Sequence, residues 1–197
     1  MRTADVDLLI VPGWGRNSDD HWQSRWVRNL KTACTIVQDD WDKPDRDAWV
    51  ARIVAAVAAA SRPAVLIAHS CGVLAAVHAA QQLTPSRIAA ALLVAPPDLE
   101  ARAPVEAFMR AEGPGLVFPR GFLPVPMAPL PFPALVIASA NDPYCRPDRA
   151  RAFAAAWGAR FADAGEAGHI NTASGHGPWP EGLLQLGALL NSLPAHI

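Results

Sequence analysis

The chain is 197 residues long, 51% of them hydrophobic, and carries a formal net charge of −1. This length suits one well-packed domain, so we expect a single domain over residues 1–197. The near-zero charge offers no electrostatic basis for binding nucleic acid or an anionic membrane surface. Because no apolar run approaches a signal sequence or a membrane span in length, we expect a cytoplasmic protein without membrane contacts. The sequence does not indicate a protein partner.

The cysteine and histidine patterns give no sign of a bound metal. The three cysteines show no C-x-x-C spacing, and the histidines form neither H-x-x-x-H nor H-E-x-x-H. We therefore expect free thiols, with neither a metal site nor a disulfide framework. No cofactor is expected either.

Apolar segments of strand length alternate with helical stretches along the chain. Most of the strand segments are continuous hydrophobic runs, which is typical of strands buried on both faces of a parallel sheet. The alternation predicts an α/β fold in which helices cover a parallel sheet of about six strands, a three-layer α/β/α sandwich. The expected strands are 6–11, 34–38, 64–68, 88–95, 134–138 and 159–162, and the expected helices are 21–31, 47–60, 71–83, 147–157 and 180–193.

The seven tryptophans divide between helices and loops. Those at helical spacing are interpreted as core residues. Those in loops are candidates for lining a substrate pocket, together with Gly13. The helical group is Trp22, Trp26, Trp49 and Trp157, and the loop group is Trp14, Trp41 and Trp179.

One interval interrupts the alternation. Ten of the nineteen prolines lie between Pro96 and Pro133. Because proline fixes φ and removes a backbone donor, residues 96–132 are expected to be mostly irregular, with one short helix over 104–111. We interpret this insertion as a small lid over the carboxyl edge of the sheet, and an ordinary surface excursion is the alternative.

A buried strand ends in a serine with small residues on both sides. Ser70 has Ala68 two positions before it and Gly72 two positions after it. This pattern is typical of a nucleophile elbow, a strained strand-to-helix turn whose flanking positions must be small. The alternative is that Ser70 only caps the following helix.

A nucleophilic serine needs a base and an orienting carboxylate. Asp142 follows the expected strand 134–138, and His169 follows the last expected strand. The order Ser70, Asp142, His169, with each residue in a loop after a strand, is that of α/β-hydrolases. His176 is the alternative base, but it lies further beyond the last strand. We therefore predict that His169 activates Ser70 and that Asp142 orients the imidazole.

Two backbone N–H groups are candidates for an oxyanion hole. Cys71 N–H directly follows the nucleophile and opens a helix. The loop after the first strand offers Trp14 N–H, with Gly13 permitting close approach, although Gly13 and Gly15 could instead be plain turn residues. The thiol of Cys71 is a poorer nucleophile candidate than Ser70, because an elbow centred there would have a histidine and a valine at its flanks.

Two other functions are compatible with parts of this pattern. Residues 13–18 approximate a dinucleotide-binding G-x-G-x-x-G, and Asp39 and Asp40 come at the end of the second expected strand. The third glycine is Ser18, however, and the bulky Trp14 occupies a loop that must approach a pyrophosphate closely. The other alternative is a non-catalytic binding module on a hydrolase scaffold. The function we expect is hydrolysis of an ester, thioester or activated amide of a small acyl substrate through an acyl-enzyme, most similar to a carboxylesterase.

Short motifs along nearly the whole chain complete the pattern. They are Pro12-Gly13-Trp14, His21-Trp22, His69-Ser70-Cys71-Gly72, Asn141-Asp142-Pro143-Tyr144, and the run from Gly168-His169-Ile170-Asn171 through Ser174-Gly175-His176-Gly177 to Trp179-Pro180. With these motifs the chain resembles the small serine hydrolases grouped with retinoblastoma-binding protein 9 and the YdeN-like proteins. It departs from the wider hydrolase pattern at Ala68, where a glycine is common.

The resemblance implies a fold and roles for three residues. Ser70, Asp142 and His169 would be the nucleophile, acid and base of a minimal α/β-hydrolase. The sheet would have the strand order 2-1-3-4-5-6 and lack the first two strands of the larger hydrolases. Because the substrates of this family are poorly defined, the resemblance does not identify what the protein cleaves.

Overall fold

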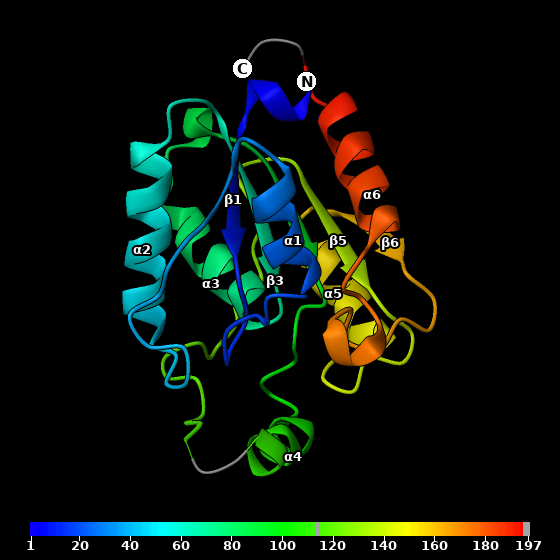
Figure 1. Cartoon of the computed structure of the whole chain (residues 1–197). Coiled ribbons are helices and arrows are strands. Elements are labelled where there is room, and N and C mark those ends of the chain that lie inside the picture. The colour runs from blue at the N-terminus through cyan, green and yellow to red at the C-terminus, as the bar shows by residue number, and fades with distance from the viewer. Residues whose placement is uncertain (113–114, 195–197) are drawn as a thin grey trace.

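The computed structural model describes residues 1–112 and 115–194. Within these residues, six parallel strands form one sheet in the order β2-β1-β3-β4-β5-β6 (Figure 1). The predicted parallel sheet and its strand order are confirmed. The strands are β1 Asp7–Val11, β2 Ala33–Thr35, β3 Ala64–His69, β4 Ile88–Val94, β5 Ala134–Ala138 and β6 Arg160–Asp163.

Helices cover both faces of the sheet, and the alternating side chains of β1 show how the layers pack. Leu8 and Ile10 face the core formed with α1 and α6, whereas Leu9 and Val11 face the core formed with α2, α3 and α5. The predicted three-layer α/β/α sandwich is therefore confirmed. The helices are α1 Trp22–Asn29, α2 Arg46–Ala59, α3 Cys71–Ala79, α4 Arg102–Glu112, α5 Pro147–Ala156 and α6 Pro180–Asn191.

The interior explains the hydrophobic runs of the sequence. The central strands β3 and β4 are buried along their entire length, as expected for strands covered on both faces. The four tryptophans interpreted as core residues from their helical spacing are all buried: Trp22, Trp26, Trp49 and Trp157.

The edge strand β2 is shorter and begins earlier than the predicted strand 34–38. Its pairing with β1 ends where Ile10 faces Thr35, after which Ile36 donates one more hydrogen bond, to the carbonyl of Ile10 at 2.8 Å. Ile36 and Gln38 are buried on either side of the exposed Val37, so the chain keeps the alternation of a strand after it has left the ladder. The strand therefore ends at Thr35, three residues before the predicted end at residue 38, so Asp39 and Asp40 do not directly follow it.

The proline-rich insertion contains α4, which begins two residues before the predicted helix 104–111. Pro104 is its third residue, a position whose N–H would have no intrahelical acceptor, so proline costs no helical hydrogen bond there. Residues 113 and 114 of the insertion lie outside the described residues. The strands point toward the end of the molecule where α4 lies (Figure 1). Further along the insertion, the fully buried Phe122 anchors the chain in the core against Trp49.

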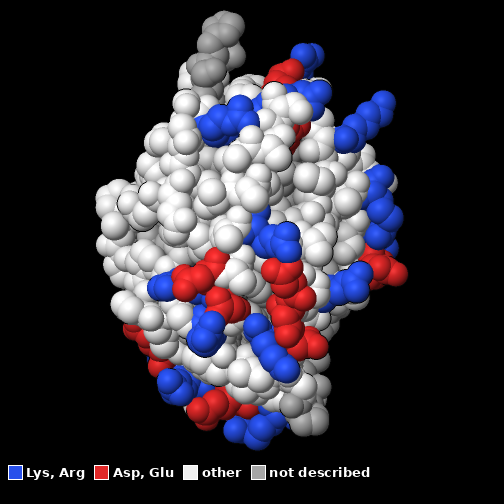
Figure 2. All heavy atoms as spheres, turned by 90° about the vertical axis from the view of Figure 1, so that its left-hand side faces the viewer, with Lys and Arg blue, Asp and Glu red and all other residues white. Residues whose placement is uncertain are grey.

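Charged side chains on the face covered by α2 are of mixed sign. Figure 2 shows basic and acidic groups side by side there, without a large patch of either sign. Ion pairs near this face include Arg46 with Asp47, Arg52 with Asp39, and Arg120 with Asp45. In the described part of the chain, no helix is both long and apolar enough to cross a membrane.

Candidate active site

Ser70 lies in the turn between β3 and α3, at the carboxyl edge of the sheet. Its φ of 54° and ψ of −130° place it in a backbone conformation that costs a non-glycine residue about 1–3 kcal/mol. Ser70 occupies the N-cap position of α3, but its side chain makes no capping hydrogen bond. Its Oγ instead lies 2.8 Å from Nε2 of His169. The helix-cap alternative is therefore wrong, and the turn has the geometry of a nucleophile elbow.

Two glycines let the backbone close around Ser70. A Cβ at Gly72 would lie 2.4 Å from the carbonyl oxygen of Val11, so α3 packs directly on the end of β1. A Cβ at Gly13 would lie 2.9 Å from Cβ of Ser70. Gly15 differs, because a Cβ there would meet no described atom within 4 Å and its φ is 83°. Close approach to Ser70 thus requires glycine at position 13, whereas Gly15 is a turn residue.

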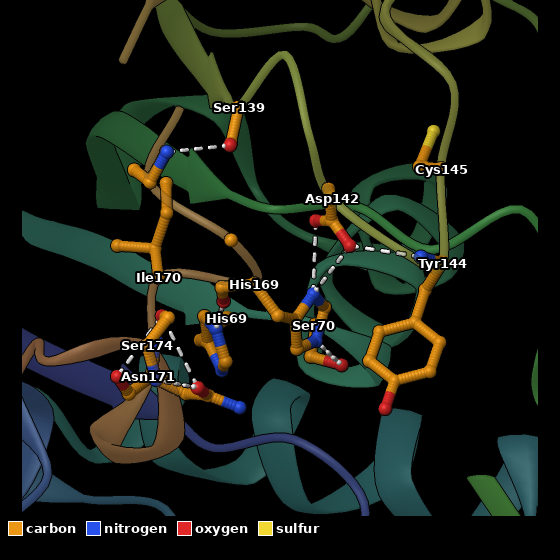
Figure 3. Close-up of polar contacts among 12 residues, drawn as sticks. His69, Ser70, Ser139, Asp142, Tyr144, Cys145, His169, Ile170, Asn171 and Ser174 are labelled. Carbon is orange, nitrogen blue, oxygen red and sulfur yellow. Dashed lines mark hydrogen bonds and ion pairs between the residues drawn. The ribbon is translucent and has the colours of Figure 1, made fainter. Parts of the chain in front are cut away.

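Ser70, His169 and Asp142 form a continuous hydrogen-bonded series (Figure 3). Nδ1 of His169 lies 3.0 and 2.9 Å from the two carboxylate oxygens of Asp142. The side chain of Asp142 is 2% exposed and that of His169 is 9% exposed. A carboxylate can only accept, so Nδ1 carries the proton and the lone pair of Nε2 faces the hydroxyl of Ser70.

The two loops that carry Asp142 and His169 are bonded to each other. Oδ1 of Asn141 accepts from Gly168 N–H at 2.7 Å, and Oγ of Ser139 accepts from Ala167 N–H at 2.9 Å. Asp142 itself accepts from Tyr144 N–H at 2.9 Å. These bonds hold the carboxylate and the imidazole at a fixed separation.

The two N–H groups predicted for an oxyanion hole lie on loops that meet at Ser70. Cys71 N–H is at the start of α3, and Trp14 N–H follows Gly13, which packs on Ser70. Within the described chain, neither group donates to a backbone carbonyl. Unused donors beside a nucleophile are what stabilisation of a developing oxyanion requires. The thiol of Cys71 is buried, and desolvation raises its pKa far above the ordinary value, so it remains protonated.

Two further histidines continue the series behind His169, and the sequence analysis assigned them no role. The ring centroids of His69 and His169 are 4.9 Å apart, as are those of His21 and His69. Nε2 of His69 lies 2.9 Å from the carbonyl of His169, so it carries the proton and donates. Burial, followed by the charge of His169, lowers the pKa of His21 to about 4 and that of His69 well below its usual value. Both rings stay neutral at neutral pH and do not compete with His169 for a proton.

Gln23 is another residue that the sequence analysis missed. It is fully buried in the first turn of α1. Its amide nitrogen donates to the carbonyls of Ile67 at 2.9 Å and Val11 at 3.3 Å, and its amide oxygen accepts from Asn17 at 2.7 Å. Gln23 therefore ties the ends of β1 and β3 together and holds the loop that carries Trp14.

A cavity of about 420 Å³ opens over Ser70 and His169. Gly13 and Trp14 line it, as does Phe108 of α4. Among the described residues, no group of three or more histidine, cysteine, aspartate or glutamate side chains could hold a metal ion. The cavity is large enough for a small organic molecule.

Two tryptophans predicted for the pocket lie elsewhere. Trp179 is buried, and its ring centroid is 4.9 Å from that of Trp22 and 6.0 Å from that of Trp26. Trp41 packs against Trp49, with centroids 5.9 Å apart, and lines a separate hollow beside β1 and β2. Both predictions are corrected, because a tryptophan in a loop can turn toward the core as readily as toward a site.

The alternative base His176 also lies outside the cavity lining. Its Nδ1 is 3.2 Å from Oγ of Ser174, in the turn after His169. Of the two candidates, it is His169 whose imidazole contacts Ser70.

Comparison with known proteins agrees with this architecture. The family model described as "Serine hydrolase" matches residues 8–188, which include the elbow and both partner loops. The chain belongs to the serine hydrolase family. A search of curated proteins gave no match.

Solved structures resemble this serine hydrolase over nearly its whole length. A YdeN-like hydrolase from Pectobacterium atrosepticum is 35% identical with a TM-score of 0.80, and the alignment covers 98% of this chain and 95% of that one. The ydeN product of B. subtilis is 17% identical with a TM-score of 0.68, and the alignment covers 94% of this chain and 98% of that one. The esterase RhEst1 from Rhodococcus sp. ECU1013 is 15% identical with a TM-score of 0.65, and the alignment covers 98% of this chain and 93% of that one. The predicted YdeN-like resemblance is confirmed, and the link to retinoblastoma-binding protein 9 stays a prediction.

Proposed function

We propose that this serine hydrolase cleaves a carboxylic ester, thioester or activated amide through an acyl-enzyme on Ser70. The observation that carries the proposal is the hydrogen-bonded series from Ser70 Oγ through His169 to the buried carboxylate of Asp142. A serine hydroxyl is a weak nucleophile at neutral pH unless a base removes its proton. The series supplies that base in the required tautomer.

In the proposed reaction, Nε2 of His169 takes the proton as Oγ of Ser70 attacks the carbonyl carbon. Asp142 holds Nδ1–H and stabilises the imidazolium that forms. When the tetrahedral intermediate collapses, the leaving group departs with the proton from Nε2 and the acyl group stays on Oγ. A water molecule then attacks the acyl carbon, with His169 again as base, and the acid product leaves as Ser70 regains its proton.

The oxyanion of each intermediate would be held by the N–H groups of Cys71 and Trp14. Removing one such donor typically raises the barrier by about 2.7–4 kcal/mol. Gly13 supports this assignment because its packing on Ser70 brings the Trp14 loop up to the nucleophile. We assign the insertion at residues 96–132 as the lid of this site, since Val105 and Phe108 of α4 line the cavity.

Labelling with a fluorophosphonate probe tests the nucleophile. The native protein should be labelled, and Ser70→Ala should abolish labelling. Ser86→Ala, at an exposed position outside the cavity lining, is the matched control and should be labelled like the native protein. Labelling of Ser70→Ala would overturn the assignment.

Turnover of p-nitrophenyl acetate tests the partner carboxylate. Asp142→Asn would favour the wrong imidazole tautomer, and we expect kcat to fall by about 10⁴-fold. Because asparagine has nearly the same shape, the circular dichroism spectrum should be unchanged. Turnover near the native value would refute the role of Asp142.

A further inference from the structure

The cavity over Ser70 is lined by both apolar and polar residues, which we call its apolar side and its polar side. Arg16, Asn17 and Thr172 line the polar side. Two of the apolar lining residues, Leu99 and Val105, are almost completely buried. The apolar side is lined by Trp14, Leu99, Val105, Phe108, Leu116 and Tyr144.

Three aromatic rings on the apolar side form a row that begins at the imidazole of His169. The ring centroid of Tyr144 is 4.6 Å from that of His169, with the planes at 82°. Phe108 follows at 5.6 Å and 78°, and Trp14 follows Phe108 at 5.2 Å and 65°. All three contacts are edge-to-face, an arrangement that aromatic pairs prefer at these separations.

The ends of this row are fixed by hydrogen bonds. Nε1 of Trp14 donates to the carbonyl of Asp42 at 3.0 Å. The backbone of Tyr144 donates to the carboxylate of Asp142 and accepts from Asp98 N–H at 2.9 Å. The middle ring, Phe108, comes from α4 and is half-buried. A ring that enters the cavity would therefore meet a preformed aromatic wall.

We infer that this cavity takes esters or thioesters that carry an aromatic ring next to the scissile carbonyl group, and that Phe108 is the residue that selects them. The inference rests on the proposed function. A substrate ring would extend the row by a further edge-to-face or stacked contact, which an alkyl group of the same size does not make. The volume of about 420 Å³ has room for a compact ring.

Boronic acids test this inference without knowledge of the natural substrate. The serine oxygen bonds to boron, which becomes tetrahedral and anionic, and the hydroxyl proton passes to His169. We would measure inhibition constants of phenyl-, cyclohexyl- and methylboronic acid against p-nitrophenyl acetate hydrolysis. The acidity of each boronic acid is the same for every variant, so a change in the ratio of inhibition constants reports a change in the pocket.

Phe108→Ala should reduce the preference for phenyl over methyl by about tenfold. Phe108→Leu keeps an apolar side chain and should reduce the preference for phenyl over cyclohexyl by about threefold or more. Met109→Ala, the next residue of α4 and outside the cavity lining, is the matched control and should leave both ratios unchanged.

The possible failures are distinguishable. If methylboronic acid inhibits and Phe108→Ala leaves the phenyl-to-methyl ratio unchanged, selection of an aromatic ring is refuted while the serine mechanism stands. If Phe108→Leu leaves the phenyl-to-cyclohexyl ratio unchanged, the pocket selects size and not aromaticity, and the inference is again refuted. If none of the three acids inhibits and the fluorophosphonate probe does not label the protein, the proposed function fails as well.

Discussion

Replacing Gln23 by methionine should destabilise the fold at the site itself. Methionine has a similar length and fills the same buried space, but it cannot donate to the carbonyls of Val11 and Ile67 or accept from Asn17. A typical intramolecular hydrogen bond contributes about 1 kcal/mol, so the loss of three corresponds to about 3 kcal/mol in the free energy of unfolding. For a chain of this size, a loss of about 3 kcal/mol lowers Tm by roughly 6–12 °C.

Urea unfolding followed by tryptophan fluorescence measures this free energy, and circular dichroism measures Tm. Gln81→Met is the matched control, because Gln81 is exposed and its replacement should change the free energy of unfolding by less than about 0.5 kcal/mol. A loss below about 1 kcal/mol in Gln23→Met would refute the reasoning, since it would mean that water replaces the buried amide at little cost.

Two further predictions concern the packing and the protonation of the site. Gly72→Ala would place a Cβ 2.4 Å from the carbonyl oxygen of Val11, and we expect urea unfolding to show a loss of about 3 kcal/mol or more. Gly187→Ala, at a helical position where a Cβ meets no described atom, should gain up to about 1 kcal/mol, and equal effects of the two substitutions would contradict the packing argument. The second prediction uses His21, whose pKa is lowered to about 4 in the folded protein against about 6.5 when unfolded. The unfolded state binds more protons between these values, so stability should fall as the pH drops from about 6.5 to 4, by up to about 1.4 kcal/mol per pH unit for this group. His21→Asn keeps an N-cap acceptor for the N–H of Gln23 and should flatten the curve of unfolding free energy against pH by that amount, whereas an unchanged slope would show that His21 does not titrate in this way.

The strands of the centre could be predicted from the sequence because burial on both faces leaves a continuous apolar run. Segments 64–68 and 134–138 match β3 and β5 within one residue. The edge strand β2 could not be placed as well. After Thr35 the chain still alternates between buried and exposed residues, and periodicity reports burial and not hydrogen bonding.

The candidate site could be predicted where several weak signals share one topology. Ser70, Asp142 and His169 each follow a strand, and a parallel sheet brings such residues to one edge. Trp179 could not be placed, because spacing does not tell which way a loop side chain turns. Gln23 left no pattern at all, since its role depends on carbonyls of two strands that meet only in the folded chain.

The backbone at Ser70 has a consequence for how the sequence is maintained. With φ at 54° and ψ at −130°, position 70 would be occupied at lower energy by glycine, which has no Cβ to clash. Selection for stability alone would therefore favour the residue that cannot attack a carbonyl. Ser70 thus combines a strained backbone with a hydroxyl that faces an imidazole instead of capping the helix it begins, so the reactivity proposed for this position comes at a cost in stability.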